Sequence, residues 1–196
     1  KGPTDHFRTV TVCAKDRPGL FSSIAGVLTL NNLDILNANI YTWRNRIGLD
    51  IFTVRAPRDS LREDELWTKL RNDLYSALSG ALDLDAALDE KLLSYRPARK
   101  AGLEKPDRVV VDNESSGFFT VVEVYTHDFP GLLYKITNAL FRRNLDVLIA
   151  KIATHVDQVV DIFYIRDVDG QKVDSEEAVT GIKDAIGQVL QNGREP

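Results

Sequence analysis

An internal repeat restricts the possible folds of this chain more than any other sequence feature. Residues 16–21 (DRPGLF) correspond to residues 128–133 (DFPGLL), 112 positions later. Residues 32–36 (NLDIL) match residues 144–148 (NLDVL) at the same displacement. Self-similarity at a fixed period indicates duplicated structural units, and this period is too long for a solenoid. We therefore predict two copies of one domain, each with its own core.

The displacement shortens by one residue farther along each copy. Residues 50–52 (DIF) match residues 161–163 (DIF) at a displacement of 111. A slip of one residue inside a strand would turn every side chain to the opposite face, whereas a turn tolerates it. We therefore expect a hairpin turn before the matched segment, over residues 45–48 in the first copy.

Hydropathy patterning predicts the order β-α-β-β-α in the first copy. The predicted elements are strands over 7–14, 34–44 and 49–55 and helices over 20–30 and 61–79. Pro18 suits the first helical position because it has no N–H to leave unbonded. A capping box of Ser60 and Glu63 opens the second helix, and Gly80 ends it.

The second copy repeats this pattern. Its predicted elements are strands over 119–126, 146–154 and 159–167 and helices over 131–143 and 175–191. Such units form α+β sandwiches of the ferredoxin-like type (βαββαβ), with antiparallel sheets. The fourth strand of that order is missing, and residues 108–112 (RVVVD) are the candidate. They complete the first sheet or add an edge to the second, and the sequence alone leaves both options open.

A segment rich in helix-breaking residues suggests the domain boundaries. We predict a first domain over 6–95, a linker over 96–107 and a second domain over 108–196. Residues 82–95 have a helical pattern, and residues 96–102 (RPARKAG) are basic and rich in helix breakers, as expected of a solvated tether. The chain begins with Lys rather than Met, and we expect it to be part of a longer protein.

Composition excludes several classes of function. The formal net charge is −4 and the sequence pI is about 5.4, so binding to nucleic acid or to an anionic membrane is disfavoured. The single cysteine, Cys13, rules out an internal disulfide and a cysteine-based metal cluster. We expect Cys13 to pack in the core, and we expect a cytoplasmic protein.

The Asp-x-Pro-Gly-Leu element is the strongest local signal for a binding site. It precedes the first helix of each copy, where main-chain N–H groups carry partial positive charge and attract a carboxylate. Asp16 or Asp128 beside those amides would bind an ammonium group. The amides and the aspartate together therefore predict a pocket for an α-amino acid. The alternative is that these aspartates only cap the helix. Asp34 and Asp146, which open the second strand of each copy, are either part of this pocket or ordinary loop residues.

These motifs resemble the ACT domain, a module that senses small molecules. The tandem pair, with residues 108–116 (RVVVDNESS) and 120–124 (TVVEV) joining it, resembles the C-terminal regulatory region of the bifunctional PII uridylyltransferase/uridylyl-removing enzymes. The resemblance implies an effector amino acid, L-glutamine in that family, at an interface between domains. It nominates the ligand-binding residues Asp16, Gly19, Leu20, Asp34, Asp128, Gly131, Leu132 and Asp146.

The resemblance also implies partners: the catalytic domains of a parent chain, the PII protein through that parent, and a second copy of the chain in a homodimer. The parent enzyme is expected to use Mg²⁺, with no cofactor in this chain. One departure is that Arg17 corresponds to Phe129, so the two sites are expected to differ in affinity or competence.

No catalytic motif is evident in the sequence. Asp83 and Asp85 have the spacing of a nucleotidyl-transfer pair, but they fall in a segment that we expect to be a solvent-facing helix. The dipeptide His127-Asp128 is isolated, and residues 167–170 lack most of a calcium loop. Two other functions stay open: a pure assembly module that acts through exposed sheet edges, and an RNA-binding module. RNA binding is disfavoured because the central strands lack basic residues beside their aromatics.

Overall fold

The computed structural model describes residues 6–43, 47–57, 62–93, 106–154 and 159–193. The first unit consists of β1 (Phe7–Lys15), α1 (Leu20–Leu30), β2 (Ile35–Thr42), β3 (Ile47–Arg55), α2 (Glu63–Ser79) and α3 (Leu84–Leu93). The second unit consists of β4 (Arg108–Asp112), β5 (Thr120–Thr126), α4 (Leu132–Phe141), β6 (Leu145–Thr154), β7 (Val159–Asp167) and α5 (Glu176–Asn192). Residues 96–105 of the predicted linker lie outside the described residues.

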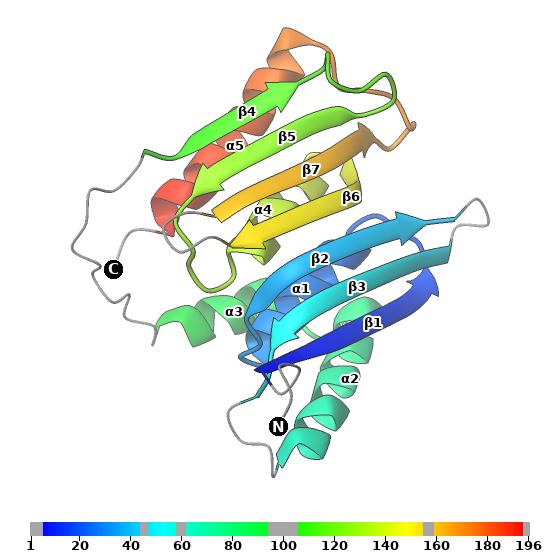
Figure 1. Ribbon diagram of the computed structural model, residues 1–196, viewed down its shortest axis with the longest axis vertical. Helices are drawn as coiled ribbons and strands as arrows, with labels where there is room; N and C mark the ends of the chain where they lie inside the picture. The colour runs from blue at the N-terminus through cyan, green and yellow to red at the C-terminus, as the bar shows by residue number, and fades with distance from the viewer. Residues whose placement is uncertain (1–5, 44–46, 58–61, 94–105, 155–158, 194–196) are drawn as a thin grey trace.

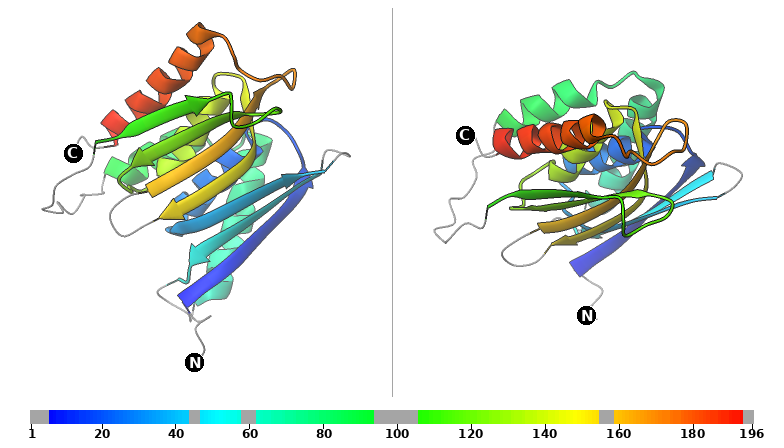
Figure 2. Two further views of the ribbon diagram at one scale, coloured as in Figure 1. Left: turned by 45° about the horizontal axis from the view of Figure 1, so that its top comes forward. Right: turned by 90° about the horizontal axis from the view of Figure 1, so that it is seen from above.

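The strands form two antiparallel sheets, with the orders β1-β3-β2 and β4-β5-β7-β6 (Figure 1). The helices lie on one side of both sheets, which confirms the predicted α+β class with antiparallel sheets (Figure 2). Strand β4 pairs antiparallel with β5, so residues 108–112 form an edge of the second sheet. This edge strand precedes β5 in the chain, whereas the ferredoxin-like order places it after the second helix.

Local backbone requirements explain where the helices begin and end. Gly19 and Gly131 precede α1 and α4 at φ values of 79° and 81°, a conformation that is strained for other residues. Pro18 therefore lies one residue before the N-cap and not at the predicted first helical position. Gly80 ends α2 at φ 78°, as predicted, and the Ser175 side chain caps α5. Ser60 of the predicted capping box lies outside the described residues.

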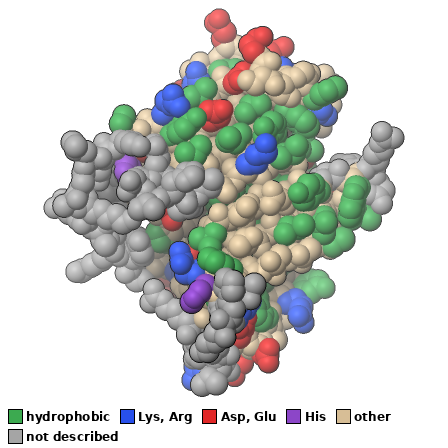
Figure 3. Space-filling view, in the orientation of Figure 1, with side chains coloured by type: hydrophobic (Ala, Val, Ile, Leu, Met, Phe, Trp, Pro, Cys, Tyr) green, Lys and Arg blue, Asp and Glu red, His purple; other side chains and the backbone are tan. Residues whose placement is uncertain are grey.

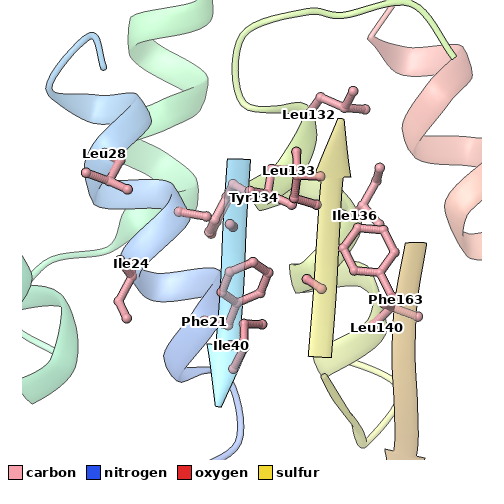
Figure 4. Packing of buried hydrophobic residues seen from close by; sticks show 14 of the residues in the cluster. Phe21, Ile24, Leu28, Ile40, Leu132, Leu133, Tyr134, Ile136, Leu140 and Phe163 are labelled. Carbon is pink, nitrogen blue, oxygen red and sulfur yellow. The ribbon is translucent and has the colours of Figure 1, made fainter. Parts of the chain in front are cut away.

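The buried side chains form one continuous cluster across both units, which differs from the predicted pair of separate cores. Helices α1 and α4 pack against each other, and β2 lies beside β6. Phe21 and Ile40 of the first unit and Tyr134, Ile136 and Leu140 of the second unit belong to this cluster (Figure 4). The cause is that each unit has an apolar helix surface that only the other unit covers.

Helix α3 adds polar contacts to the same junction. The Tyr134 hydroxyl donates to Asp85 Oδ1 over 2.7 Å, and Asn138 Nδ2 donates to the same oxygen over 2.9 Å. Lys91 Nζ donates to the Leu30 carbonyl, the last residue of α1, over 2.6 Å. The Asp85 side chain is 44% exposed, in line with the expected solvent-facing helix, and it also anchors α3 to α4.

Two further expectations about side-chain placement are wrong. Cys13 is exposed, because the odd-numbered positions of β1 face away from the helices. Gly48 lies inside β3 rather than in a turn, since that strand begins at Ile47. The sheet face opposite the helices is solvent-accessible and mixes hydrophobic and polar side chains (Figure 3). In the part of the chain that the structure describes, no helix has the length and apolar character needed to span a membrane.

Candidate functional site

A cavity lies at the junction of the two units. The first unit contributes the β1–α1 loop, the start of α1 and the inner face of β2 and β3, while the second contributes α4 and the start of β6. The lining residues are Asp16, Arg17, Gly19, Leu20, Phe21, Ser22, Ile40, Asp50, Thr137, Phe141, Leu145, Asp146 and Val147. Its volume is about 20 Å³, which is room for one water molecule but not for an amino acid.

Three aspartates from three different elements meet at this cavity. Asp16 comes from the β1–α1 loop, Asp50 from the middle of β3, and Asp146 from the start of β6. Burial, together with the negative charges of Asp16 and Asp146, raises the pKa of Asp50 to about 7. Among the described residues, no group of three histidine, cysteine, aspartate or glutamate side chains could hold a metal ion. The cavity thus concentrates three carboxyl groups from both units at one place.

The alternation of β3 places Asp50 inside the molecule. The buried positions of this strand are Gly48, Asp50, Phe52 and Val54. Asp50 is paired across the sheet with Val12 on β1 and Ile40 on β2, and neither side chain has a polar group. Only 2% of Asp50 is exposed, and its Oδ2 has no hydrogen-bond partner. An ionisable group in these surroundings is costly to keep, which points to a role other than packing.

Asp161 occupies the equivalent place in β7 of the second unit and is 1% exposed. Its strand has the same inward series, with Phe163 and Ile165 after it. Sequence reasoning used Asp50 and Asp161 only to align the repeats and missed them as site residues. The available signal was a charged residue at an inward position of an alternating strand, present in both copies.

Neither Asp16 nor Asp128 caps a helix. The N-cap residues of α1 and α4 are Gly19 and Gly131, and neither helix has a side-chain cap. The alternative that these aspartates serve only as caps is therefore not what the structure shows. In α1, the Ser22 and Ser23 hydroxyl groups both donate to the Gly19 carbonyl, over 2.9 Å each.

The two units meet with approximate twofold symmetry. A Cβ built on Gly19 would lie 3.1 Å from the Phe141 ring, and one on Gly131 would lie 3.7 Å from the Thr29 side chain. Thr29 and Phe141 are equivalent positions near the ends of α1 and α4. The loop of each unit thus lies against the first helix of the other.

The predicted site residues separate into two groups. The cavity brings together Asp16, Gly19, Leu20 and Asp146, which come from both units. The other four, Asp34, Asp128, Gly131 and Leu132, do not line it. Asp34 is 71% exposed and pairs with Arg55 over 3.2 Å, while Gly131 and Leu132 are buried against the first unit's helices or in the core. The second copy of the loop motif, at the symmetry-related place between the units, therefore has different surroundings from the first.

Arg17 and Phe129 account for part of that difference. Arg17 lines the cavity, and its Nη2 donates to the Leu78 carbonyl at the end of α2 over 2.5 Å. The Phe129 ring packs against Gly193 at the end of α5, where an added Cβ would lie only 2.4 Å away. Both residues contact the end of the second helix of their own unit. Arg17 thus places a cation in the lining of the cavity, where the second copy has the uncharged Phe129 at the equivalent position.

The chain resembles several proteins with established names. No protein-family model matches it. Among curated relatives, the bifunctional uridylyltransferase/uridylyl-removing enzyme of Rhodospirillum rubrum is 36% identical over 178 residues, which are 90% of this chain and 19% of the relative. The enzymes with this name from Novosphingobium aromaticivorans and Azospirillum brasilense are 40% and 36% identical, over 89% and 92% of this chain and 19% and 20% of the relatives.

Among solved structures, an aspartate kinase from Synechocystis aligns with a TM-score of 0.48 and 14% identity, over 96% of this chain and 27% of that chain. A match at this level carries no conclusion about the present chain. The curated relatives have a higher sequence identity to this chain, which spans about a fifth of their length. The chain is therefore homologous to the C-terminal part of the bifunctional uridylyltransferase/uridylyl-removing enzymes.

Proposed function

We propose that this chain is an amino-acid-sensing regulatory module and that its effector is L-glutamine. Its parent would be a cytoplasmic enzyme that attaches uridylyl groups to the PII protein and removes them, with Mg²⁺ bound elsewhere in that parent. The observation that carries the proposal is the cavity between the units, which combines a helix start with three aspartates. Helix-start amides attract a carboxylate and aspartates attract an ammonium group, so the two together suit a zwitterion.

The size of the cavity indicates how a ligand would regulate. With a volume of about 20 Å³, it admits an amino acid only if the units shift apart at this junction. A ligand changes an equilibrium only by its difference in affinity between two arrangements. Glutamine would therefore favour the wider arrangement of the units. A coupling of about 1–3 kcal/mol would change the activity of a parent enzyme roughly 5–150-fold.

Isothermal titration calorimetry of the chain with L-glutamine tests the proposal. We expect saturable binding, with at least a tenfold weaker affinity in the Asp16→Ala variant, because a charge-assisted contact is worth about 1.5–3 kcal/mol. Asp184→Ala, on the exposed side of α5, is the matched control and should bind like the wild type. L-Glutamate and L-asparagine serve as competitors that define the specificity.

Three results would contradict the proposal in whole or in part. A wild-type chain that binds none of these amino acids would overturn the sensing function. Equal affinity for all three would retain the sensing function and overturn glutamine as the effector. Tighter binding of another amino acid would favour a sensor of that ligand, with no link to uridylyl transfer.

A further inference from the structure

We propose that Asp50 receives the ammonium group of the effector, and that this ammonium group displaces a proton held by the carboxyl group in the free protein. The inference rests on the proposed amino-acid-sensing function and deepens it. It adds a strand residue to the recognition of the cation, beside Asp16 of the β1–α1 loop. It also makes binding dependent on pH.

The placement of Asp50 is the first argument. Its side chain is buried, it contributes to the cavity lining, and its Oδ2 has no hydrogen-bond partner. The cross-strand neighbours Val12 and Ile40 are apolar and cannot supply a donor. An acceptor in this position is satisfied only by a group that enters the cavity, or by carrying a proton itself.

The surrounding charges are the second argument. Asp16 from the β1–α1 loop and Asp146 from β6 both act on Asp50, and the one cation among the lining residues is Arg17. Arg17 directs Nη2 to the Leu78 carbonyl. Helices α1 and α4 contribute the hydroxyl groups of Ser22 and Thr137, which donate to main-chain carbonyls of their own unit. The carboxyl groups of Asp16, Asp50 and Asp146 at one cavity favour a cationic ligand.

The third argument concerns protonation. Burial, followed by the charges of Asp16 and Asp146, raises the pKa of Asp50 to about 7. Near neutral pH the carboxyl group is therefore partly protonated, and it is mostly protonated at lower pH. An ammonium group favours the ionised form, so the carboxyl proton leaves to solvent when the ligand binds. Below the pKa of Asp50, the affinity should rise about tenfold per pH unit, and above it the affinity should level off.

Calorimetric titration of the full chain with L-glutamine in phosphate and in Tris measures the proton release, because the two buffers differ in ionisation enthalpy. We expect release approaching one proton per bound ligand at about pH 6 and almost none at about pH 8.5, following the titration of a single group. Asp50→Asn should abolish the release and weaken binding at pH 8.5 by at least tenfold. Asp184→Asn should change neither quantity.

A second probe needs no variant. N-Acetyl-L-glutamine keeps the carboxylate and the side-chain amide but lacks the ammonium charge, and we expect it not to bind. If the wild type bound glutamine without proton release, or if Asp50→Asn bound it as tightly, the assignment of Asp50 would be overturned and the sensing function would stand. If N-acetyl-L-glutamine bound as tightly as L-glutamine, the assignment of Asp50 would likewise be overturned and the sensing function would stand. A wild type that bound no glutamine would overturn both.

Discussion

At the scale of single residues, the buried carboxyl groups of Asp50 and Asp161 are the most unusual feature of the molecule. In each strand, the inward-facing residues that follow the aspartate are apolar. A valine in place of the aspartate would pack without a desolvation penalty. The duplicated units nevertheless both have an aspartate at this place. Because such a group destabilises the fold when it is ionised, its effect should be visible in the pH dependence of stability.

We expect Asp50 to make the wild type less stable as pH rises from about 4 through 7. The folded-state pKa of about 7 lies above the ordinary aspartate pKa of 3.8, so the folded state binds more protons in this window. The free energy of unfolding therefore falls with rising pH, by at most about 4 kcal/mol. Asp50→Asn should lack this contribution, which urea denaturation at about pH 4.5 and pH 8.5 would measure. A difference between wild type and variant that does not change with pH would contradict the expectation.

At the scale of elements, the close packing of α1, α3 and α4 joins the two units. A Cβ on Gly26 of α1 would lie 2.7 Å from the Tyr134 ring of α4 and 3.3 Å from the Leu84 side chain of α3. The Tyr134 ring is held in place, because it is buried and its hydroxyl donates to Asp85. The junction thus has no room for an extra methyl group at Gly26.

Two helical glycines provide a matched pair of substitutions. Gly26→Ala should destabilise the chain by about 1–3 kcal/mol through overpacking. Gly187→Ala, in α5 with no atom within 4 Å of the added methyl, should stabilise it by about 0.5–1 kcal/mol through helix propensity. Thermal unfolding followed by far-UV circular dichroism measures both changes. Two shifts of the same sign would show that α1 and α4 are not packed as closely as the structure has them.

At the scale of the whole molecule, the continuous core predicts that the two units unfold together. Both tryptophans, Trp43 and Trp67, belong to the first unit, and Trp67 packs against the shared core. Tryptophan fluorescence therefore reports on the first unit alone, whereas far-UV circular dichroism reports on both. We expect the two signals to give the same urea midpoint, as a cooperative two-state transition requires. A fluorescence midpoint that differs from the dichroism midpoint would indicate independent units.

Much of the architecture follows from local sequence. The repeat, the alternation of the strands and the helical spacing from Leu20 predicted the element order, because side-chain periodicity within an element depends on its own residues. The helix stop at Gly80 was predictable from the residue itself, because glycine adopts the positive φ found there at no steric cost. Strand β4 was different, since either sheet edge was open to it and only pairing with β5 decided the choice.

The candidate site shows the same division. The loop motif pointed to Asp16, and the aspartate that opens the second strand of each copy pointed to Asp146. Tertiary structure alone decided that these two belong to one cavity, that Asp50 lines the same cavity, and that Cys13 faces solvent. The physical reason is that sequence periodicity identifies the faces of an element, whereas the long-range packing of α1 against α4 determines which faces meet.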